Sequence, residues 1–197
     1  MLQDQQIDWK EHLLKRSMWG GAIKVQSGEM YILEDIEDGD GDYTIFKQKQ
    51  VSYSPAWYKM CDEIIVNAID HYVVYNKKVT DLNITYDDVT GDISVRNNGP
   101  GIYVKKVKNI KGELVYTPQL IFAGFLSGSN FDGDKDNERI VGGQNGIGAK
   151  ITSVFSTRFT VETCDVKSRK HYVQTFENNL QVINPPTIRD IEKGAKS

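Results

Sequence analysis

The sequence predicts an α/β two-layer sandwich, in which a mixed and mostly antiparallel sheet carries its helices on one face. Strand-like segments follow one another in adjacent pairs, a pattern typical of hairpins. Between them lie apolar segments with helical spacing, one of which extends over residues 54–75. The 197 residues, 39% hydrophobic and 26% charged, fit a soluble globular chain of one large or two small domains.

Charge, cysteine content and apolar runs exclude several classes of protein. A net charge of −3 gives no general basic footprint for nucleic acid. Cys61 and Cys164 have apolar neighbours and predict reduced thiols rather than a disulfide framework. The N-terminus lacks the apolar core of a signal peptide, and no apolar run is long enough to span a membrane. We therefore expect an intracellular protein with no membrane partner.

The first elements expected along the chain are a polar arm and a hairpin. Residues 1–8 predict a flexible arm, and residues 9–17 a short helix. Residues 30–33 and 43–53 predict strands. The acidic segment between them, 34–42, partly resembles a calcium loop, but it lacks the EF-hand spacing and closing glutamate. It is therefore interpreted as a solvated hairpin turn.

A long helix follows, with Ser54 as its N-cap, Pro55 at its first position and an end near Tyr75. It is apolar nearly all round, which predicts burial on two faces. One polar strip interrupts it, formed at i, i+4 and i+7 by Glu63, Asn67 and Asp70. The strip either faces solvent or lines a cleft. Because its neighbours are apolar, a cleft is at least equally supported.

The next hairpin, LNITY with residues 92–96, continues into Asn97–Ile102, NNGPGI. The Asn97 carboxamide both donates and accepts hydrogen bonds, and so could read an adenine edge. Gly99 and Gly101 would let a flat ring lie against the backbone. From these residues alone, an ordinary Asn-Gly turn is an equal explanation.

The second half of the sequence is expected to form shorter helices and strands. A basic cluster within residues 103–113 is interpreted as a solvated loop, and the polar run 127–139 as a mobile lid. The sequence also predicts a short helix opened by Thr117 and Pro118, a helix at 147–155, antiparallel strands at 158–163 and 170–176, a third strand at 180–183 and a polar tail at 185–197.

The glycine-rich segment VGGQNGIGAK, residues 141–150, precedes the expected helix. Unpaired amides at a helix start bind anions, phosphate above all. The segment is not a P-loop, because Ala149 follows Gly148 and the lysine is displaced to Lys150. It lacks the dinucleotide fingerprint as well. The glycines alone do not distinguish an anion site from a ligand-free turn.

Four stretches together resemble the ATP-binding fold shared by gyrase, Hsp90, histidine kinases and MutL, the Bergerat-type fold. They are DEIIVNAID (62–70), NNGPGI (97–102), LSGSNFD (126–132) and GGQNGIGAK (142–150). YSPAWYKMCDEIIVNAIDH, PQLIFAGFLSGSNFD and FSTRFTVET resemble the ATPase domain of eukaryotic-type type IIA DNA topoisomerases in particular. The resemblance covers roughly residues 10–177 and implies an ATP-binding domain at 9–184.

The resemblance also implies roles for individual residues. Glu63 would be the general base that activates water, Asn67 would ligate Mg²⁺, and Asn97 would contact adenine. The other nucleotide-binding positions that it implies are Gly99, Gly101, Ser129, Asn130, Gly143, Gln144, Asn145, Gly146, Ile147, Gly148, Ala149 and Lys150. ATP and Mg²⁺ are thus the implied cofactors.

Three positions depart from the family pattern. Pro100 stands where a basic residue is usual, Ile147 where tyrosine is common, and Ser17 replaces a proline. They indicate a divergent member and are compatible with an origin in a large DNA virus. A transducer lysine and the DNA-cleaving tyrosine are expected beyond Ser197, so we expect these 197 residues alone to hydrolyse ATP weakly.

The implied function is the ATPase region of a DNA topoisomerase II. ATP would dimerise two copies at an N-gate, and hydrolysis would drive passage of one double-stranded DNA through another. The implied location is the nucleus for a cellular enzyme, or host cytoplasm for a viral one. The alternatives are a chaperone or mismatch-repair ATPase of the same superfamily, or a nucleotide-gated dimerisation module without useful turnover.

Overall fold

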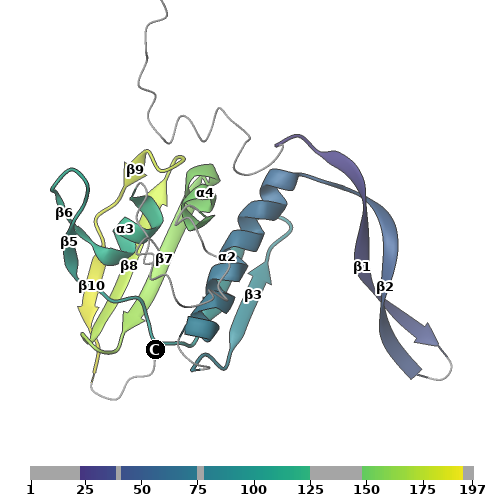
Figure 1. The fold of residues 1–197 in the computed structure, drawn as a ribbon, viewed down its shortest axis with the longest axis horizontal. Helices are drawn as coiled ribbons and strands as arrows, with labels where there is room; N and C mark the ends of the chain where they lie inside the picture. Colours follow the sequence, from purple (N-terminus) through teal and green to yellow (C-terminus); the bar gives the residue numbers. More distant parts are fainter. Residues whose placement is uncertain (1–22, 39–40, 75–77, 125–147, 193–197) are drawn as a thin grey trace, which may run out of the picture.

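A computed structural model describes residues 23–38, 41–74, 78–124 and 148–192 of the chain. Helix α4 contacts both α2 and α3, and strands lie against these helices (Figure 1). Every strand pairing in these ranges is antiparallel. The α/β two-layer class predicted from the sequence is confirmed. The expected helix at 9–17 and lid at 127–139 lie outside the described residues.

The chain begins its described part with a long hairpin, β1 (Gln26–Asp38) and β2 (Gly41–Tyr53), which projects away from the helices (Figure 1). The two strands pair along their whole length, from Gln26 opposite Tyr53 to Asp38 opposite Gly41. This pairing confirms the predicted hairpin, but it places residues 34–38 and 41–42 of the acidic segment in the paired strands, where the sequence predicted a turn.

Helix α2, Pro55–Val74, starts as its sequence predicts. The Trp57 amide donates to the Ser54 hydroxyl at 3.4 Å, and the Tyr58 amide donates to the Ser54 carbonyl at 3.0 Å, which caps the helix. Burial on two faces is wrong for the described structure, since only Ala56 and Ala68 are buried. Ile69, in the second half of the helix, is 46% exposed. Apolar periodicity fixes which residues share a face but not what covers that face.

Two hairpins and one short helix follow. β3 (Leu82–Tyr86) pairs with β4 (Ile93–Asn97), as expected. β5 (Lys106–Lys108) and β6 (Leu114–Tyr116) form a hairpin where the sequence predicted a solvated basic loop. α3 spans Thr117–Ala123 and ends before Gly124, whose amide donates to the Leu120 carbonyl.

The largest sheet lies beneath α3 and α4, in the strand order β10-β8-β7 with β9 also paired to β8. Its members are β7 (Arg158–Asp165), β8 (Lys170–Glu177), β9 (Val182–Ile183) and β10 (Thr187–Asp190). β10 falls in the segment expected to be a polar tail. α4 spans Gly148–Phe155. The core between the layers contains Val154, Val161, Phe176 and Leu180, packed against Phe122 and Phe159.

The single sheet expected from the sequence is divided into separately bonded sheets, because the chain leaving β4 meets β7 through side chains. The Ile102 amide donates to the Thr163 hydroxyl at 2.8 Å. The Val104 amide donates to Asp165 Oδ2 at 2.8 Å. Burial acts to raise the pKa of Asp165, but hydrogen bonds from Ser168 and from backbone amides outweigh it and hold that pKa below its usual value. This contact places the end of β4 beside the main sheet.

Among the described residues, no helix is long and apolar enough to cross a membrane. Cys61 and Cys164 are both free thiols, in agreement with the sequence prediction. Burial raises the pKa of each thiol, which disfavours the reactive thiolate form.

Candidate functional site

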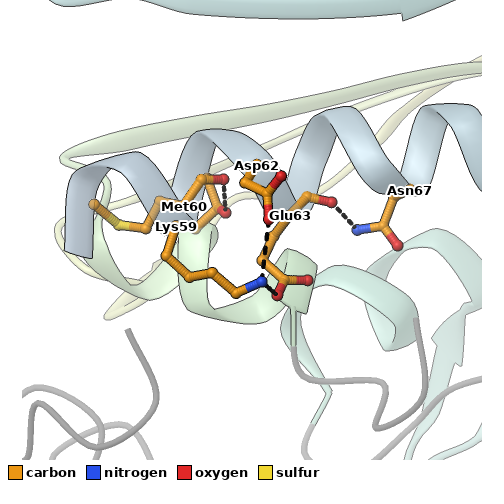
Figure 2. A network of polar contacts seen from close by, with 6 residues as sticks. Lys59, Met60, Asp62, Glu63 and Asn67 are labelled. Carbon is orange, nitrogen blue, oxygen red and sulfur yellow. Dashed lines mark hydrogen bonds and ion pairs between the residues drawn. The ribbon is translucent and has the colours of Figure 1, made fainter. Parts of the chain in front are cut away.

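Glu63 lies in the third turn of α2 and is held by a lysine one turn earlier (Figure 2). Lys59 Nζ lies 2.7 Å from Glu63 Oε1 and 3.1 Å from Asp62 Oδ2. The hydrogen bond to Glu63 raises the pKa of Lys59, although burial acts in the opposite direction. The Glu63 side chain is 20% exposed, so it is partly desolvated while it remains paired. A carboxylate fixed in this way is oriented through one oxygen and keeps the other for a second contact.

The second oxygen of Glu63 faces the start of α4. A Cβ added to Gly148, the first residue of α4, would lie 2.7 Å from the Glu63 carboxyl carbon and closer still to Oε2. α4 is also bonded to α2 through Thr152, whose hydroxyl donates to the Met60 carbonyl at 2.9 Å. The unpaired amides and the dipole of a helix start favour negative charge beside them. Glu63 and α4 therefore meet at a point suited to an anion and to an attacking water.

Asn67 lies one turn beyond Glu63 on the same side of α2 (Figure 2). Its Nδ2 donates to the Glu63 carbonyl at 2.6 Å, and only the NH₂ end of an amide can make that bond. The oxygen Oδ1 is thereby turned away from the helix axis, with no hydrogen-bond partner among the described residues. An outward amide oxygen is a hard ligand of the kind that Mg²⁺ accepts.

The predicted metal site fits this arrangement. Within the described ranges, no three His, Cys, Asp or Glu side chains are grouped to hold a metal. Mg²⁺ commonly takes one or two protein oxygens and completes its shell with substrate phosphates and water. Asn67 would supply such an oxygen, and Mg²⁺ bound there would neutralise phosphate charge.

Lys150 is buried in the first turn of α4, with only 2% of its surface exposed. Burial lowers the pKa of this lysine to about 8. A desolvated ammonium gains strongly from a nearby anion, because the low dielectric strengthens the interaction. The predicted phosphate contact of Lys150 is therefore electrostatically reasonable.

Asn97 ends β4 and meets the last turns of α2. Its Oδ1 accepts the Gly99 amide at 3.1 Å and lies 3.1 Å from His71 Nδ1. Glu63 and His71 are eight residues apart, which is about 12 Å along a helix axis. α2 therefore presents the Glu63 and Asn67 pair at one place and the Asn97 contact at another, a spacing suited to the two ends of a nucleotide.

The two glycines after Asn97 are required by packing. A Cβ on Gly99 would lie 2.5 Å from Val79 Cγ2 and 2.9 Å from the His71 ring. A Cβ on Gly101 would lie 2.8 Å from the Thr163 hydroxyl and closer still to the Cys164 carbonyl. The sequence predicted a base-binding surface at these glycines; the structure adds a packing role, with Gly99 against Val79 and α2 and Gly101 against β7.

The structure thus brings Glu63, with Asn67 one turn further along α2, against Gly148, and places Asn97 at the end of β4. Lys150 is buried in the same first turn of α4. Ala149 lies between Gly148 and Lys150 in the first turn of α4. Ser129, Asn130 and residues 143–147 lie outside the described residues.

Sequence reasoning missed two residues of the site. Lys59 precedes Glu63 by four residues, and this spacing on a helix predicts an ion pair between them. His71 carries no local signal, because its partner Asn97 is 26 residues away.

Comparison with known proteins gives consistent matches. Residues 53–187 match the family described as histidine kinase-, DNA gyrase B-, and HSP90-like ATPase. The chain is 38% identical over 191 residues to DNA topoisomerase 2 of Candida glabrata, covering 96% of this chain and 13% of that protein. It is 36% identical over 195 residues to DNA topoisomerase 2 of Acanthamoeba polyphaga mimivirus, covering 97% of this chain and 15% of that protein. The chain therefore spans only a small part of each relative.

Two solved structures share its fold. The ATPase region of Saccharomyces cerevisiae topoisomerase II matches with a TM-score of 0.79 and 35% identity, over 96% of this chain and 47% of the other. The ATPase and transducer domains of DNA topoisomerase II from Balamuthia mandrillaris match with a TM-score of 0.80 and 32% identity, over 95% and 45%.

Proposed function

This chain belongs to the histidine kinase-, DNA gyrase B-, and HSP90-like ATPase family, and we propose that it binds ATP with Mg²⁺ and hydrolyses it with Glu63 as the base. The observation that supports this most is the contact of Glu63 and Asn67, on one turn of α2, with the first residue of α4. That contact combines a fixed carboxylate, an outward amide oxygen and a helix start.

Each residue contributes a separate part of the chemistry. Lys59 holds Glu63 Oε1, so Oε2 is left to accept a proton from water beside α4. Water activated there attacks the terminal phosphorus as the bond to the bridging oxygen breaks and ADP leaves, and the amides at the start of α4 stabilise the charge of the phosphoryl group. Asn67 would hold Mg²⁺ against the phosphates, and Asn97 would orient the base. Catalysis then depends mainly on positioning and on fixed charge.

The test is Glu63→Gln in the full-length protein, whatever sequence flanks these 197 residues. Glutamine keeps the size of the side chain and cannot take the proton, so hydrolysis should fall at least about 100-fold, the lower end of the contribution of a general base. ATP binding should remain within about threefold. Glu162→Gln is the matched control, since Glu162 lies on β7 and pairs with His171. Hydrolysis at the wild-type rate by Glu63→Gln would refute the assignment of the base.

We further propose that the full-length protein is a type II DNA topoisomerase, in which ATP dimerises two copies of this region at an N-gate. The similarity to topoisomerase ATPase regions over nearly the whole chain supports this. ATP-dependent decatenation of linked DNA circles distinguishes it from a chaperone or mismatch-repair ATPase. Absence of duplex passage with intact ATP hydrolysis would favour those alternatives.

Dimerisation is measured separately by sedimentation with ATP, with a non-hydrolysable analogue and with ADP. A gate requires association with the first two and dissociation with ADP, whereas a module without turnover stays associated after ATP is added. The 197 residues alone are expected to turn over ATP slowly, and addition of a following transducer-like segment should raise the rate. The proposed location, nucleus or viral replication site, follows from the DNA substrate and is tested by imaging a fluorescent fusion.

A further inference from the structure

Residues 103–116, which contain β5 and β6 and are called the basic hairpin below, concentrate positive charge on an acidic chain. They hold four lysines and one glutamate, whereas the whole chain has a net charge of −3. All four lysines are exposed: Lys105, Lys106, Lys108 and Lys111. Among the described residues, none of the four has a carboxylate within ion-pair distance, whereas Lys47 and Lys49 of β2 both pair with Glu34. The charge of the basic hairpin is therefore available to a partner.

The two carboxylates that contact the basic hairpin are bonded to other groups. Asn109 Nδ2 donates to Glu113 Oε2 at 2.7 Å, which holds this side chain at the turn. The buried Asp165 accepts the Val104 amide at the base of the hairpin and the Lys167 amide in the β7–β8 turn. The exposed side chain of Lys167 adds a fifth cation beside that base. Neither carboxylate pairs with a lysine side chain of this surface.

Aromatic rings, rather than acids, position two of the ammonium groups. Lys105 Nζ lies 5.2 Å from the centre of the Tyr103 ring, and Lys106 Nζ lies 5.4 Å from the centre of the Tyr116 ring. A ring attracts the cation but carries no net charge, so the positive charge is kept. A side chain that is already positioned loses less conformational entropy when it binds an anion.

The hairpin also arranges its lysines in a row. Lys106 and Lys108 occupy alternate positions of β5, so they share one face and lie about 7 Å apart along the strand. Figure 1 shows β5 and β6 at the end of the molecule opposite the β1–β2 hairpin, away from α2. The row therefore lies outside the proposed ATP site and is accessible to a large, extended anion.

We propose that the basic hairpin is a contact site for the phosphate backbone of double-stranded DNA. The inference rests on the proposed topoisomerase function for its choice of a duplex as the partner. A row of exposed ammonium groups suits the regularly repeated phosphates of a DNA strand, and their attraction needs no particular base sequence. An acidic protein segment is the competing partner, and the experiment separates the two.

The experiment places a benzophenone amino acid at position 110 of the full-length protein, in place of Ile110, which is 79% exposed between the two strands. Irradiation with labelled duplex DNA then reports contact at this hairpin, whatever other parts of the protein bind DNA. Lys106→Gln with Lys108→Gln should raise the DNA concentration for half-maximal crosslinking about 30-fold at about 0.15 M salt, the loss of two phosphate contacts. The slope of log K against log salt should become shallower by about 2.

Three controls are matched to this design. Lys47→Gln with Lys49→Gln removes the same charge from another hairpin and should leave crosslinking at position 110 unchanged. Lys106→Arg with Lys108→Arg keeps the charge and should crosslink as the wild type does. Benzophenone at Val89, which is 90% exposed in a turn that contains Asp87 and Asp88, should not crosslink to DNA. Thermal unfolding verifies that each variant is folded.

Equal crosslinking at positions 89 and 110, or an unchanged concentration dependence in Lys106→Gln with Lys108→Gln, would overturn the inference. Crosslinks from position 110 to protein instead of DNA would also overturn it, in favour of an acidic protein segment. A wild-type protein that decatenates DNA but gives no DNA crosslink at position 110 would overturn the inference and leave the proposed function intact. A protein that crosslinks there but does not decatenate would overturn the topoisomerase proposal and keep the basic hairpin as a DNA contact.

Discussion

Gly148 is the position at which a single methyl group most directly tests the contact of α4 with Glu63. A Cβ there would lie 2.7 Å from the Glu63 carboxyl carbon and 3.3 Å from Cγ, and closer than either to Oε2. Contacts of Cβ under 3.0 Å essentially do not occur, so Gly148→Ala forces the carboxylate to move by about 1 Å. The moving group is the end of a flexible side chain, which can swing toward solvent.

The magnitude follows from this displacement. A misplacement of about 1 Å in a catalytic group can cost about 100-fold in rate, which corresponds to about 2.7 kcal/mol of barrier. Stability should not fall, because Gly148 has no positive φ and alanine is favoured over glycine inside a helix by up to about 1 kcal/mol. Affinity for ATP should stay within about threefold, since the new methyl group faces Glu63.

The assay compares ATP hydrolysis, ATP affinity and thermal unfolding of Gly148→Ala in the full-length protein. Gly28→Ala is the control, because its Cβ would meet Tyr53 at an ordinary 3.7 Å. We expect a loss of hydrolysis with unchanged or raised stability. Hydrolysis at the wild-type rate would show that Glu63 does not act from this contact. A loss of stability equal to the loss of activity would show that the effect is structural.

Three other substitutions test the remaining contacts. Lys59→Met removes the cation that holds Glu63 Oε1, so kcat should fall about tenfold at constant KM in steady-state kinetics. The free energy of unfolding in urea should fall by less than about 1 kcal/mol, because the ion pair is partly exposed. Gly101→Ala places a methyl group against the Cys164 carbonyl, which cannot swing aside, so unfolding free energy should fall by about 3 kcal/mol in the same assay. The pKa of Asp165 is lowered in the folded chain, so its contribution to stability is present above about pH 4 and is lost as pH falls through the folded pKa. Asp165→Asn should therefore cost about 1–3 kcal/mol at pH 7 and progressively less as the pH falls below about 4, and a cost that does not change with pH would contradict this.

The sequence predicted the parts of the fold that depend on local signals. Ser54 and Pro55 located the start of α2, and the pairing of β7 with β8 was predicted from two neighbouring strand-like segments. The β5–β6 hairpin was missed because each strand has only three residues and β5 lies within a run of lysines. Its turn carries a signal that could have been used, since Asn109 Oδ1 accepts two amides and Gly112 has φ of 79°.

Non-local pairings lay beyond sequence reasoning. β10 follows two prolines and is a strand only because β8 presents a free edge to it. The candidate site also has a part that the sequence predicted and a part that it did not. The i, i+4 spacing of Glu63 and Asn67 placed them on one side of α2, and the family resemblance assigned their roles. The contact of Gly148 with Glu63 depends on how α4 packs against α2, which no spacing reveals.

Helix α2 connects the two ends of the proposed nucleotide site through one continuous element. Lys59, Glu63 and Asn67 lie on consecutive turns, and His71 continues the same series at i+4 toward Asn97. Because a helix is stiff along its axis, the base contact at Asn97 and the carboxylate at Glu63 hold a fixed separation. Movement of α4 would then change the contact at Glu63 without disturbing the contact at Asn97, since α4 reaches α2 through Met60 and Glu63. ATP could therefore stay bound through the base end while the phosphate end opens and closes, which is what a gate driven by hydrolysis requires.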